Sequence, residues 1–247
     1  MSLVIAAAQS RSRAGDVAWN VSRHLQIGAL AAEREVDLLV FPELSLTGYE
    51  LSLGRSHAIV PASIDLDPLR RLAMDSRMTV VVGGPVRNDR DELNIGAFSI
   101  RPDGSASTYT KEHVHESEVG FTSGPGGKVL EVGDSMVALA ICADASYPSH
   151  AARAAERGAN VYAASVMIEE DAYLRKTALL QTYALQHGMA VLMANYSGST
   201  GGLESAGKSA VWAEDGRLIV SSSGRDEVLV IGRKENGVWN GSVIPVT

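Results

Sequence analysis

Cysteine is almost absent from this chain: Cys142 is the only one in 247 residues. A lone cysteine cannot form a disulfide within the chain, so its thiol is either inert core filling or a reactive group with a base nearby. Cys142 follows the apolar run 136–141 and precedes the polar, proline-containing stretch 143–148. Nucleophiles are often presented in this way, at the end of a buried strand, but the position alone fits core filling at least as well.

Positive charge is also scarce, because 22 Lys and Arg against 29 Asp and Glu give a formal net charge of −7. Nucleic-acid binding needs a surplus of cations on one surface, and the cations here are scattered along the sequence. No apolar run approaches the roughly 20 residues that span a bilayer, and the first residues do not resemble a signal peptide. We therefore expect a cytoplasmic protein without nucleic-acid or membrane partners, in which the thiol stays reduced.

Linkers, repeats and low-complexity tracts are missing too, so we expect one domain over residues 1–247. Short aliphatic runs alternate with longer amphipathic segments, which is typical of an α/β architecture. The expected strands are 4–8, 37–41, 79–82, 93–100, a segment reaching Tyr109, 137–141, 161–165, 190–195, 210–213, 218–221 and 227–231. The expected helices are 17–35, 68–77, 149–157 and 172–187. We expect a hairpin and an edge strand from the last three strands, and a flexible loop at 197–202. Two helix-covered sheets packed face to face fit this pattern, and a single doubly wound sheet fits it nearly as well.

Two charged residues stand where other strands end. Glu43 follows the apolar strand 37–41 through Pro42, and burial at that position would raise the pKa of its carboxyl group toward that of a general base. Lys111 follows the strand that contains Tyr109, and a lysine near a reacting carbonyl can stabilise a developing oxyanion. Glu43, Lys111 and Cys142 thus form a possible base, electrophile and nucleophile.

Three segments around these residues resemble the signature segments of the nitrilase superfamily, the carbon–nitrogen hydrolases. They are 41–49 (FPELSLTGY), 109–113 (YTKEH) and 141–144 (ICAD) with Pro148. Their order matches the family, and so does their spacing of 68 residues from Glu43 to Lys111 and 31 from Lys111 to Cys142. One such segment is a weak signal, whereas three in register are specific, and further matches extend over nearly the whole chain.

The resemblance implies a four-layer α-β-β-α sandwich and a mechanism. Glu43 would deprotonate Cys142, and the thiolate would attack an amide or nitrile carbon to form a thioester. Lys111 and the backbone N–H of Ala143 would hold the oxyanion, and Tyr49, Ser165 and Val166 would line the substrate pocket. The family needs no cofactor and no metal. Its members often pair through helices beside the nucleophile, so a homodimer is implied.

Several residues near the three segments have more than one interpretation. A second glutamate often follows the lysine in this family, and Glu118 fits that place better than Glu116. Asp144 is expected to anchor the nucleophile loop. His113 and His115 lack a third ligand at metal-like spacing, so structural or solvent-facing roles are expected. Residues 169–171 (EED) are expected to start a helix, and an acidic pocket wall that suits a cationic substrate is an alternative.

The residues after the cysteine favour an amidase-like hydrolase of a small aliphatic amide or carbamoyl compound. True nitrilases of this superfamily tend to have Trp-Glu there, whereas this chain has Ala143 and Asp144. Many amidase-type members also carry an arginine two residues beyond the aspartate, where this chain has Ser146, so that positive charge is expected to be absent. The alternatives are a nitrilase, an N-acyltransferase, whose usual membrane spans are lacking here, and a catalytically silent binding protein. The substrate itself is not identified by the sequence.

Overall fold

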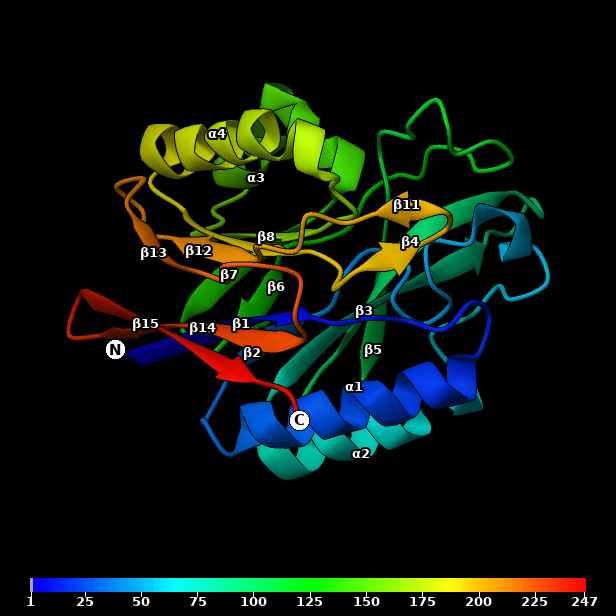
Figure 1. Cartoon of the computed structure of the whole chain (residues 1–247), viewed down its shortest axis with the longest axis horizontal. Helices are drawn as coiled ribbons and strands as arrows, with labels where there is room; N and C mark the ends of the chain where they lie inside the picture. Colours follow the sequence, from blue (N-terminus) through cyan, green and yellow to red (C-terminus); the bar gives the residue numbers. More distant parts are fainter. Residues whose placement is uncertain (1) are drawn as a thin grey trace.

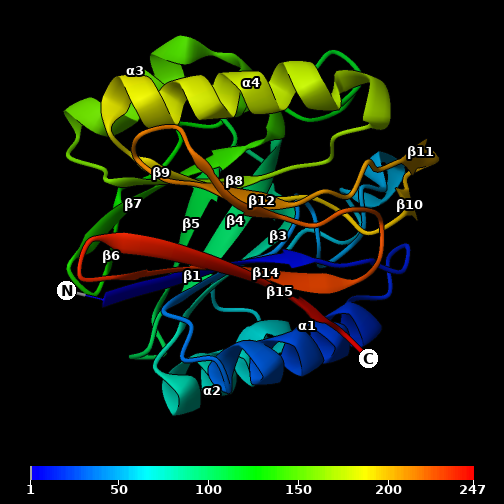
Figure 2. The same ribbon diagram turned by 60° about the vertical axis from the view of Figure 1, so that its left-hand side comes forward.

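A computed structural model describes residues 2–247 of the chain. Most of the strands belong to two large sheets. The seven-stranded sheet has the order β15-β14-β1-β2-β3-β4-β5, and the six-stranded sheet has the order β13-β12-β9-β8-β7-β6. Figure 1 shows the two sheets stacked face to face, with helices α1 and α2 outside one sheet and α3 and α4 outside the other. Figure 2 shows the same layers from a second direction. The four-layer α-β-β-α sandwich expected from the sequence is confirmed.

The elements have the following bounds. The seven-stranded sheet consists of β1 (Ser2–Gln9), β2 (Leu38–Val40), β3 (Thr79–Arg87), β4 (Leu93–Ile100), β5 (Ala106–Thr110), β14 (Val228–Glu235) and β15 (Val238–Pro245). The six-stranded sheet consists of β6 (Leu130–Val132), β7 (Ser135–Ile141), β8 (Val161–Ser165), β9 (Ala190–Ala194), β12 (Ala210–Trp212) and β13 (Leu218–Ser221). The helices are α1 (Val17–Ala32), α2 (Asp67–Ser76), α3 (Pro148–Glu156) and α4 (Glu170–His187), with short 3₁₀ turns at Leu51–Leu53, Ile64–Leu66 and Cys142–Ser146. No helix within residues 2–247 is long and apolar enough to cross a membrane.

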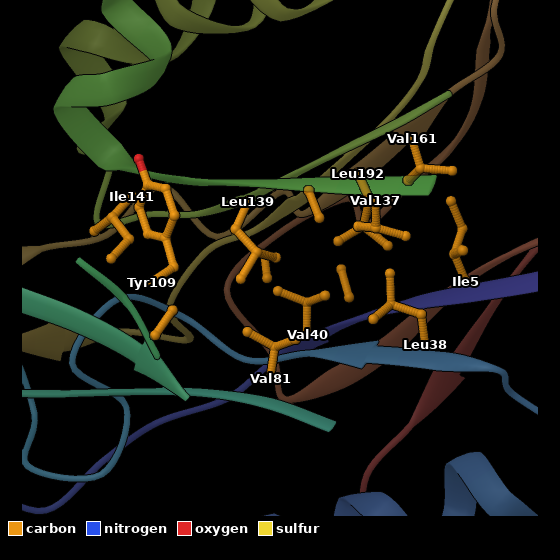
Figure 3. Close-up of a cluster of buried hydrophobic side chains, with 14 of the residues drawn as sticks. Ile5, Leu38, Val40, Val81, Tyr109, Val137, Leu139, Ile141, Val161 and Leu192 are labelled. Atoms are coloured by element: carbon orange, nitrogen blue, oxygen red, sulfur yellow. The ribbon is translucent and has the colours of Figure 1, made fainter. Parts of the chain in front are cut away.

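The hydrophobic core has three parts, one for each contact between layers. The part between the sheets takes one face of each central strand, including Val40 and Val81 from one sheet and Leu139 and Leu192 from the other (Figure 3). The other two parts lie between each sheet and its own helices. Central strands are therefore buried on both faces, which explains why β2, β3, β7 and β8 read as continuous apolar runs rather than alternating ones.

The central strands of both sheets run parallel to their neighbours: β1, β2 and β3 in one, and β7, β8 and β9 in the other. β4 pairs antiparallel with both β3 and β5, so β5 runs in the same direction as β3. The loops after β2, β5, β7 and β8 lie at carboxyl ends of strands, where functional residues commonly gather on a rigid sheet.

The C-terminal part of the chain corrects two expectations. β14 is not an edge strand, because it pairs with β1 on one side over eight residues and with β15 on the other. β15 is the edge strand, and its mostly exposed side chains left it without a hydrophobic signal. The glycine-rich segment 197–202 is also not simply a flexible loop, because β10 (Ser199–Thr200) within it pairs with β11 (Leu203–Glu204).

Candidate active site

Glu43 is held in a tight turn just beyond β2. Phe41 still donates its N–H to Val81 in the neighbouring strand at 2.9 Å, and after Pro42 the chain turns away from the sheet, with Leu44 at a φ of 54°. The hydroxyl of Tyr196 donates to the Glu43 carbonyl at 2.6 Å. A Cβ at Gly83 would lie 2.3 Å from the Leu44 nitrogen, so only glycine allows this close approach of the turn to β3.

Lys111 lies between two carboxylates. Its Nζ donates to Glu43 Oε1 at 2.6 Å and to Glu118 Oε1 at 2.5 Å, and all three side chains are buried. The hydroxyl of Tyr49 donates to the same Glu118 oxygen at 2.8 Å, and the backbone N–H of His115 donates to the other Glu118 oxygen at 2.8 Å. Glu118 is therefore fixed by three donors, whereas Glu116 is exposed.

Burial and charge act together on the acid–base groups. Burial raises the pKa of Glu43 to about 7, and Lys111 opposes that rise while the charge of Glu118 adds to it. Burial works to lower the pKa of Lys111, but the neighbouring carboxylates of Glu43 and Glu118 outweigh it and raise that pKa. The lysine is therefore a permanent cation, and Glu43 is poised to take up and release a proton near neutral pH.

Cys142 starts the 3₁₀ turn Cys142–Ser146 directly after β7. Its φ is 41°, in the left-handed region that non-glycine residues rarely occupy, and the thiol is partly buried. Sγ donates to the Met167 carbonyl at 3.5 Å, a weak hydrogen bond. Burial and the charge of Glu43 raise the pKa of the thiol, and Lys111 lowers it. The thiol is therefore protonated at rest and needs a base to become a nucleophile.

Asp144 ties the Cys142 turn to the Lys111 loop. One carboxylate oxygen accepts the backbone N–H of Ile141 at 3.1 Å, and the other accepts those of Glu112 at 3.1 Å and His113 at 2.8 Å. The hydroxyl of Tyr109 also donates to this fully buried carboxylate, at 2.7 Å. The role of loop anchor expected for Asp144 matches these contacts.

A layer of side chains behind Asp144 was not foreseen from the sequence. The hydroxyl of Tyr109 lies 2.9 Å from His150 Nε2, and His150 Nδ1 lies 2.8 Å from the hydroxyl of Tyr162. Burial lowers the pKa of His150, so its ring is held neutral among these hydroxyls. The only sequence signal for this network is that Tyr109 lies two residues before Lys111 on the same face of the extended chain.

The segment after β8 follows the strict alternation of an extended chain. Met167 packs in the core between the sheets, and Ser165 lies on the same side because it pairs with Ile141 of that core. Val166 packs in the core on the side of α3 and α4, and its N–H donates to the Ala194 carbonyl at 2.9 Å. The expectation that Val166 lines the substrate pocket therefore stays a prediction, and any contact with a substrate would have to come from its backbone, because its side chain points toward α3 and α4. The carbonyl oxygen of Met167 contacts the thiol of Cys142.

The surroundings of Ser146 also differ from expectation. The ammonium of Lys176, from α4, donates to the Ser146 hydroxyl, so a positive charge is present beside the position where an arginine was expected to be missing.

The remaining charged residues near the site lie as follows. Glu170 and Asp171 begin α4 as expected, and Glu170 forms an ion pair with Lys208. His113 is stacked on Tyr147 with ring centroids 3.9 Å apart, and His115 is exposed. Within residues 2–247, no group of three or more His, Cys, Asp or Glu is arranged to hold a metal ion.

Comparisons with known proteins identify relatives along most of the chain. The family model described as carbon-nitrogen hydrolase matches residues 4–233. An (R)-stereoselective amidase from a Pseudomonas species is 31% identical over 229 residues, which cover 89% of this chain and 80% of that protein. A nitrilase from Pyrococcus abyssi is 26% identical over 214 residues, which cover 84% of this chain and 80% of that protein.

Solved structures show the same fold. A mutant of the amidase from Nesterenkonia sp. AN1 matches with a TM-score of 0.84 and 25% identity, covering 93% of this chain and 89% of that one. In that structure, the acetamide moiety of fluoroacetamide is attached covalently to the active-site cysteine. Another mutant of the same amidase is in complex with butyramide.

Proposed function

Because the chain belongs to the carbon–nitrogen hydrolase family, we propose that it hydrolyses small aliphatic amides through a thioester on Cys142. The observation that carries this proposal is the buried chain Glu43–Lys111–Glu118 beside a single thiol that is protonated at rest. A carboxylate, a permanent cation and a thiol are the base, electrophile and nucleophile that amide hydrolysis needs. The amidases among the relatives and the solved structures support an amidase-like hydrolase of the nitrilase superfamily.

Acylation starts when Glu43 takes the proton from the thiol and the thiolate sulfur attacks the carbonyl carbon. The carbonyl oxygen becomes an oxyanion held by Lys111 Nζ and the backbone N–H of Ala143. Ala143 lies in the first turn of Cys142–Ser146, where backbone N–H groups have no partner inside the helix. The C–N bond then breaks, Glu43 gives its proton to the leaving nitrogen, and the thioester remains.

In deacylation water is the nucleophile and the Cys142 sulfur is the leaving group. Glu43 takes a proton from water, whose oxygen attacks the thioester carbon, and the same donors hold the second oxyanion. The C–S bond breaks, the sulfur leaves with the proton from Glu43, and the carboxylic acid product is released. Tyr49 acts through Glu118 to hold Lys111 in place, and the inward-facing Ser165 is a candidate contact for the substrate.

The decisive experiment detects the acyl group directly. Intact-mass measurement after brief incubation with acetamide, propionamide or butyramide should show the matching acyl mass on the protein, and none on Cys142→Ala. These amides are the first probes because the Nesterenkonia structures contain an acetamide moiety and butyramide. If no amide in a broad panel is turned over, and iodoacetamide alkylates Cys142 no faster than free cysteine, the silent binding protein is the correct reading.

A nitrilase is the second candidate, favoured by the relative from Pyrococcus abyssi that carries that name. The same thiolate attack on a nitrile carbon would give a thioimidate, with the added electron pair on nitrogen instead of oxygen. Assay of butyronitrile beside butyramide under the same conditions separates the two activities. Faster turnover of the nitrile would reverse our assignment.

We also propose a homodimer. α4 exposes Leu174 and Leu185 on the face turned away from its own sheet, at 79% and 65% of their maximal areas. The family resemblance implies pairing through helices beside Cys142, and these two leucines offer apolar surface on such a helix. Light scattering should give twice the mass of 26.1 kDa, and a mass of one chain at micromolar concentration would exclude the dimer.

One domain and a cytoplasmic location complete the proposal. The core between the sheets takes residues from both halves of the chain, from Ile5 to Trp239, which favours a single unit of folding over 1–247. The mechanism requires a reduced thiol, which the cytoplasm maintains. A single cooperative unfolding transition and recovery of the protein in the cytoplasmic fraction are the expected results.

A further inference from the structure

A cavity opens between the edge strands of the two sheets, away from the loops that carry Glu43 and Cys142. It holds about 410 Å³ and is lined by Ser99, Arg101, Ser107, Thr108, Tyr109, Gly127, Lys128, Leu130 and Leu139. β5 is the last strand of one sheet and β6 the last strand of the other, so the cavity lies at the open side of the sandwich. A volume of this size accommodates a small organic molecule.

The charge at this cavity is positive in a protein whose net charge is negative. Arg101 continues from β4 on one side, and Lys128 precedes β6 on the other. Within residues 2–247, neither side chain forms an ion pair. Asp103 lies near enough to interact with Arg101, but it is exposed and accepts the N–H of Ser105 at 2.8 Å. Two cations from different sheets thus meet at one opening.

The wall of the cavity contains a polar group that the protein leaves without a partner. Ser99 is 1% exposed, and its Oγ makes no hydrogen bond in the described chain. Buried hydroxyls are almost always hydrogen-bonded, because an unpaired one has lost its water without compensation. Ser107 pairs with Ser99 across β4 and β5, so a second hydroxyl stands beside the first.

Apart from Thr108, the rest of the lining is mainly apolar. Leu130 and Leu139 come from the six-stranded sheet and the ring of Tyr109 from the seven-stranded sheet, and Figure 3 shows Tyr109 beside Leu139 in the space between the sheets. A ligand that uses the whole cavity therefore needs an anionic group for the cations and hydroxyls and an apolar body for the leucines. Inorganic anions alone would leave that apolar wall uncovered.

We propose that this cavity is a binding site for a small organic anion, with a phosphate or carboxylate group between Arg101 and Lys128 and an apolar body against Leu130 and Leu139. Ser99 donates its hydroxyl hydrogen to the anionic group. The site is separate from Cys142, and its existence does not depend on the reaction proposed for that residue.

Calorimetric titration at constant ionic strength tests the site with four probes. Phenyl phosphate and benzoate carry an anion on an apolar body and separate a phosphate ligand from a carboxylate one. Inorganic phosphate lacks the apolar body, and phenol lacks the charge. We expect saturable binding of one phenyl phosphate or benzoate per chain, weaker binding of inorganic phosphate and none of phenol. Absence of saturable binding by both aromatic anions, or equal binding of phenol, overturns the proposal.

Variants locate the binding. Arg101→Gln and Lys128→Gln should each weaken it about tenfold or more, because each removes a charge-assisted hydrogen bond. Arg71→Gln is the matched control, since Arg71 is an exposed arginine of α2 on the far side of the seven-stranded sheet. If both cavity variants bind as tightly as the control, the anion lies elsewhere and the proposal fails.

Ser99→Ala and alkylation of the thiol separate a ligand site from two simpler explanations. Ser99→Ala should weaken binding while leaving the unfolding midpoint of the free protein unchanged or higher, because the hydroxyl has no partner to lose. A merely structural serine would lower the midpoint and leave affinity unchanged. Binding should also survive treatment with iodoacetamide, which modifies the single cysteine. Binding that disappears after alkylation belongs to the active site and contradicts the proposal.

Discussion

One carboxylate oxygen of Glu118 accepts hydrogen bonds from both Lys111 and Tyr49, so the charge and the hydrogen bond at this residue can be tested separately. Glu118→Gln keeps the shape but removes one of the two negative charges that hold the ammonium. We expect kcat on butyramide to fall about 100-fold with a smaller change in KM, because a displaced lysine is felt most at the oxyanion. Steady-state kinetics measures both constants.

Two further variants serve as controls for that prediction. Tyr49→Phe removes one hydrogen bond to Glu118 and leaves the charge, so about a tenfold loss or less is expected. Glu116→Gln alters an exposed side chain and should have no effect. Equal activity of the Glu118 and Glu116 variants would mean that the buried contact plays no part in turnover.

We predict that Glu43 gives the proposed reaction its dependence on pH. Burial raises the pKa of this carboxyl to about 7, and the base must be ionised to accept the thiol proton. We expect kcat/KM to rise as pH increases through about 7, with an apparent pKa that belongs to the coupled pair of Glu43 and Cys142. The rate of thiol alkylation should follow the same curve. A profile that is flat from pH 6 to 8 would assign the base to another group.

The sequence predicts which side chains belong to the candidate site far better than it predicts their contacts. Glu43, Lys111 and Cys142 could be proposed as one site because chemistry requires their residue types and because their segments resemble a family, and the structure brings the three side chains together. The direction of Val166 could not, since a shift of one residue turns a strand side chain to the opposite face. The Lys176 contact with Ser146 joins residues 30 positions apart, and no local pattern signals it.

At the level of elements, the turn that carries Glu43 depends on its fit against β3. Gly83→Ala would place a methyl group 2.3 Å from the Leu44 nitrogen and 2.9 Å from the Pro42 carbonyl, which are backbone atoms that cannot turn aside. We expect activity to be nearly lost and the free energy of unfolding to fall by about 2 kcal/mol or more, as for overpacking in a core. Kinetics and urea denaturation measure the two effects.

The adjacent glycine provides the matched control. A Cβ at Gly84 would meet only side-chain atoms of Phe98, Ile59 and Leu46, at 3.2 Å or more. Gly84→Ala should therefore cost less stability and retain most activity. Equal losses in the two variants would show that β3 tolerates no methyl group at all, and that the Glu43 turn has no special requirement.

Element boundaries could be predicted where hydrophobic runs are long and could not where strands are exposed or interrupted. β4, β8 and β13 have the expected bounds. Turn residues mark the end of β4 and both ends of β13. β3 continues through Gly83, Gly84 and Pro85, residues that normally end a strand, because β4 pairs with it along its length. β15 carries mainly polar or exposed residues, and only its pairing with β14 makes it a strand.

For the molecule as a whole, two buried groups give opposite responses to acid. His24 is 1% exposed, its ring nitrogens have no partner in the described chain, and burial lowers its pKa to about 3. Its ordinary pKa is 6.5, so the unfolded chain gains a proton below that pH and the folded chain does not. Stability from this group is present above pH 6.5 and is lost as pH falls toward 3, by about 1.4 kcal/mol per unit.

Glu43 acts in the other direction. Its folded pKa lies above its ordinary value of 4.5, so the folded chain binds a proton that the unfolded chain lacks between about pH 7 and 4.5. That linkage raises stability as pH falls through this range. The two groups therefore oppose each other between pH 6.5 and 4.5.

Variants separate the two responses in urea denaturation at pH 7 and pH 5. Relative to the wild type, His24→Leu should make the change from pH 7 to pH 5 more stabilising, by about 2 kcal/mol. Glu43→Gln should shift the same difference by a similar amount in the opposite direction. All other ionisable groups titrate alike in the three proteins, so their contributions cancel when the pH differences in unfolding free energy are compared. Identical pH differences in all three proteins would contradict the burial of these ionisable groups.

The global arrangement could be predicted only in part from patterns of hydrophobicity. Alternating strands and helices indicate helix-covered sheets, but strands buried on both faces look the same in one doubly wound sheet and in two stacked sheets. Contacts between distant segments distinguish the two arrangements. Leu38 in one sheet and Val137 in the other, for example, face each other in the core (Figure 3). The resemblance to a family supplied that information.

The left-handed backbone at Cys142 implies a trade-off between folding and chemistry. A side chain held there costs on the order of 1–3 kcal/mol, which glycine would avoid. Selection for a durable fold alone would therefore replace the thiol. A catalyst must keep it, and the remainder of the sandwich has to supply the compensating stability.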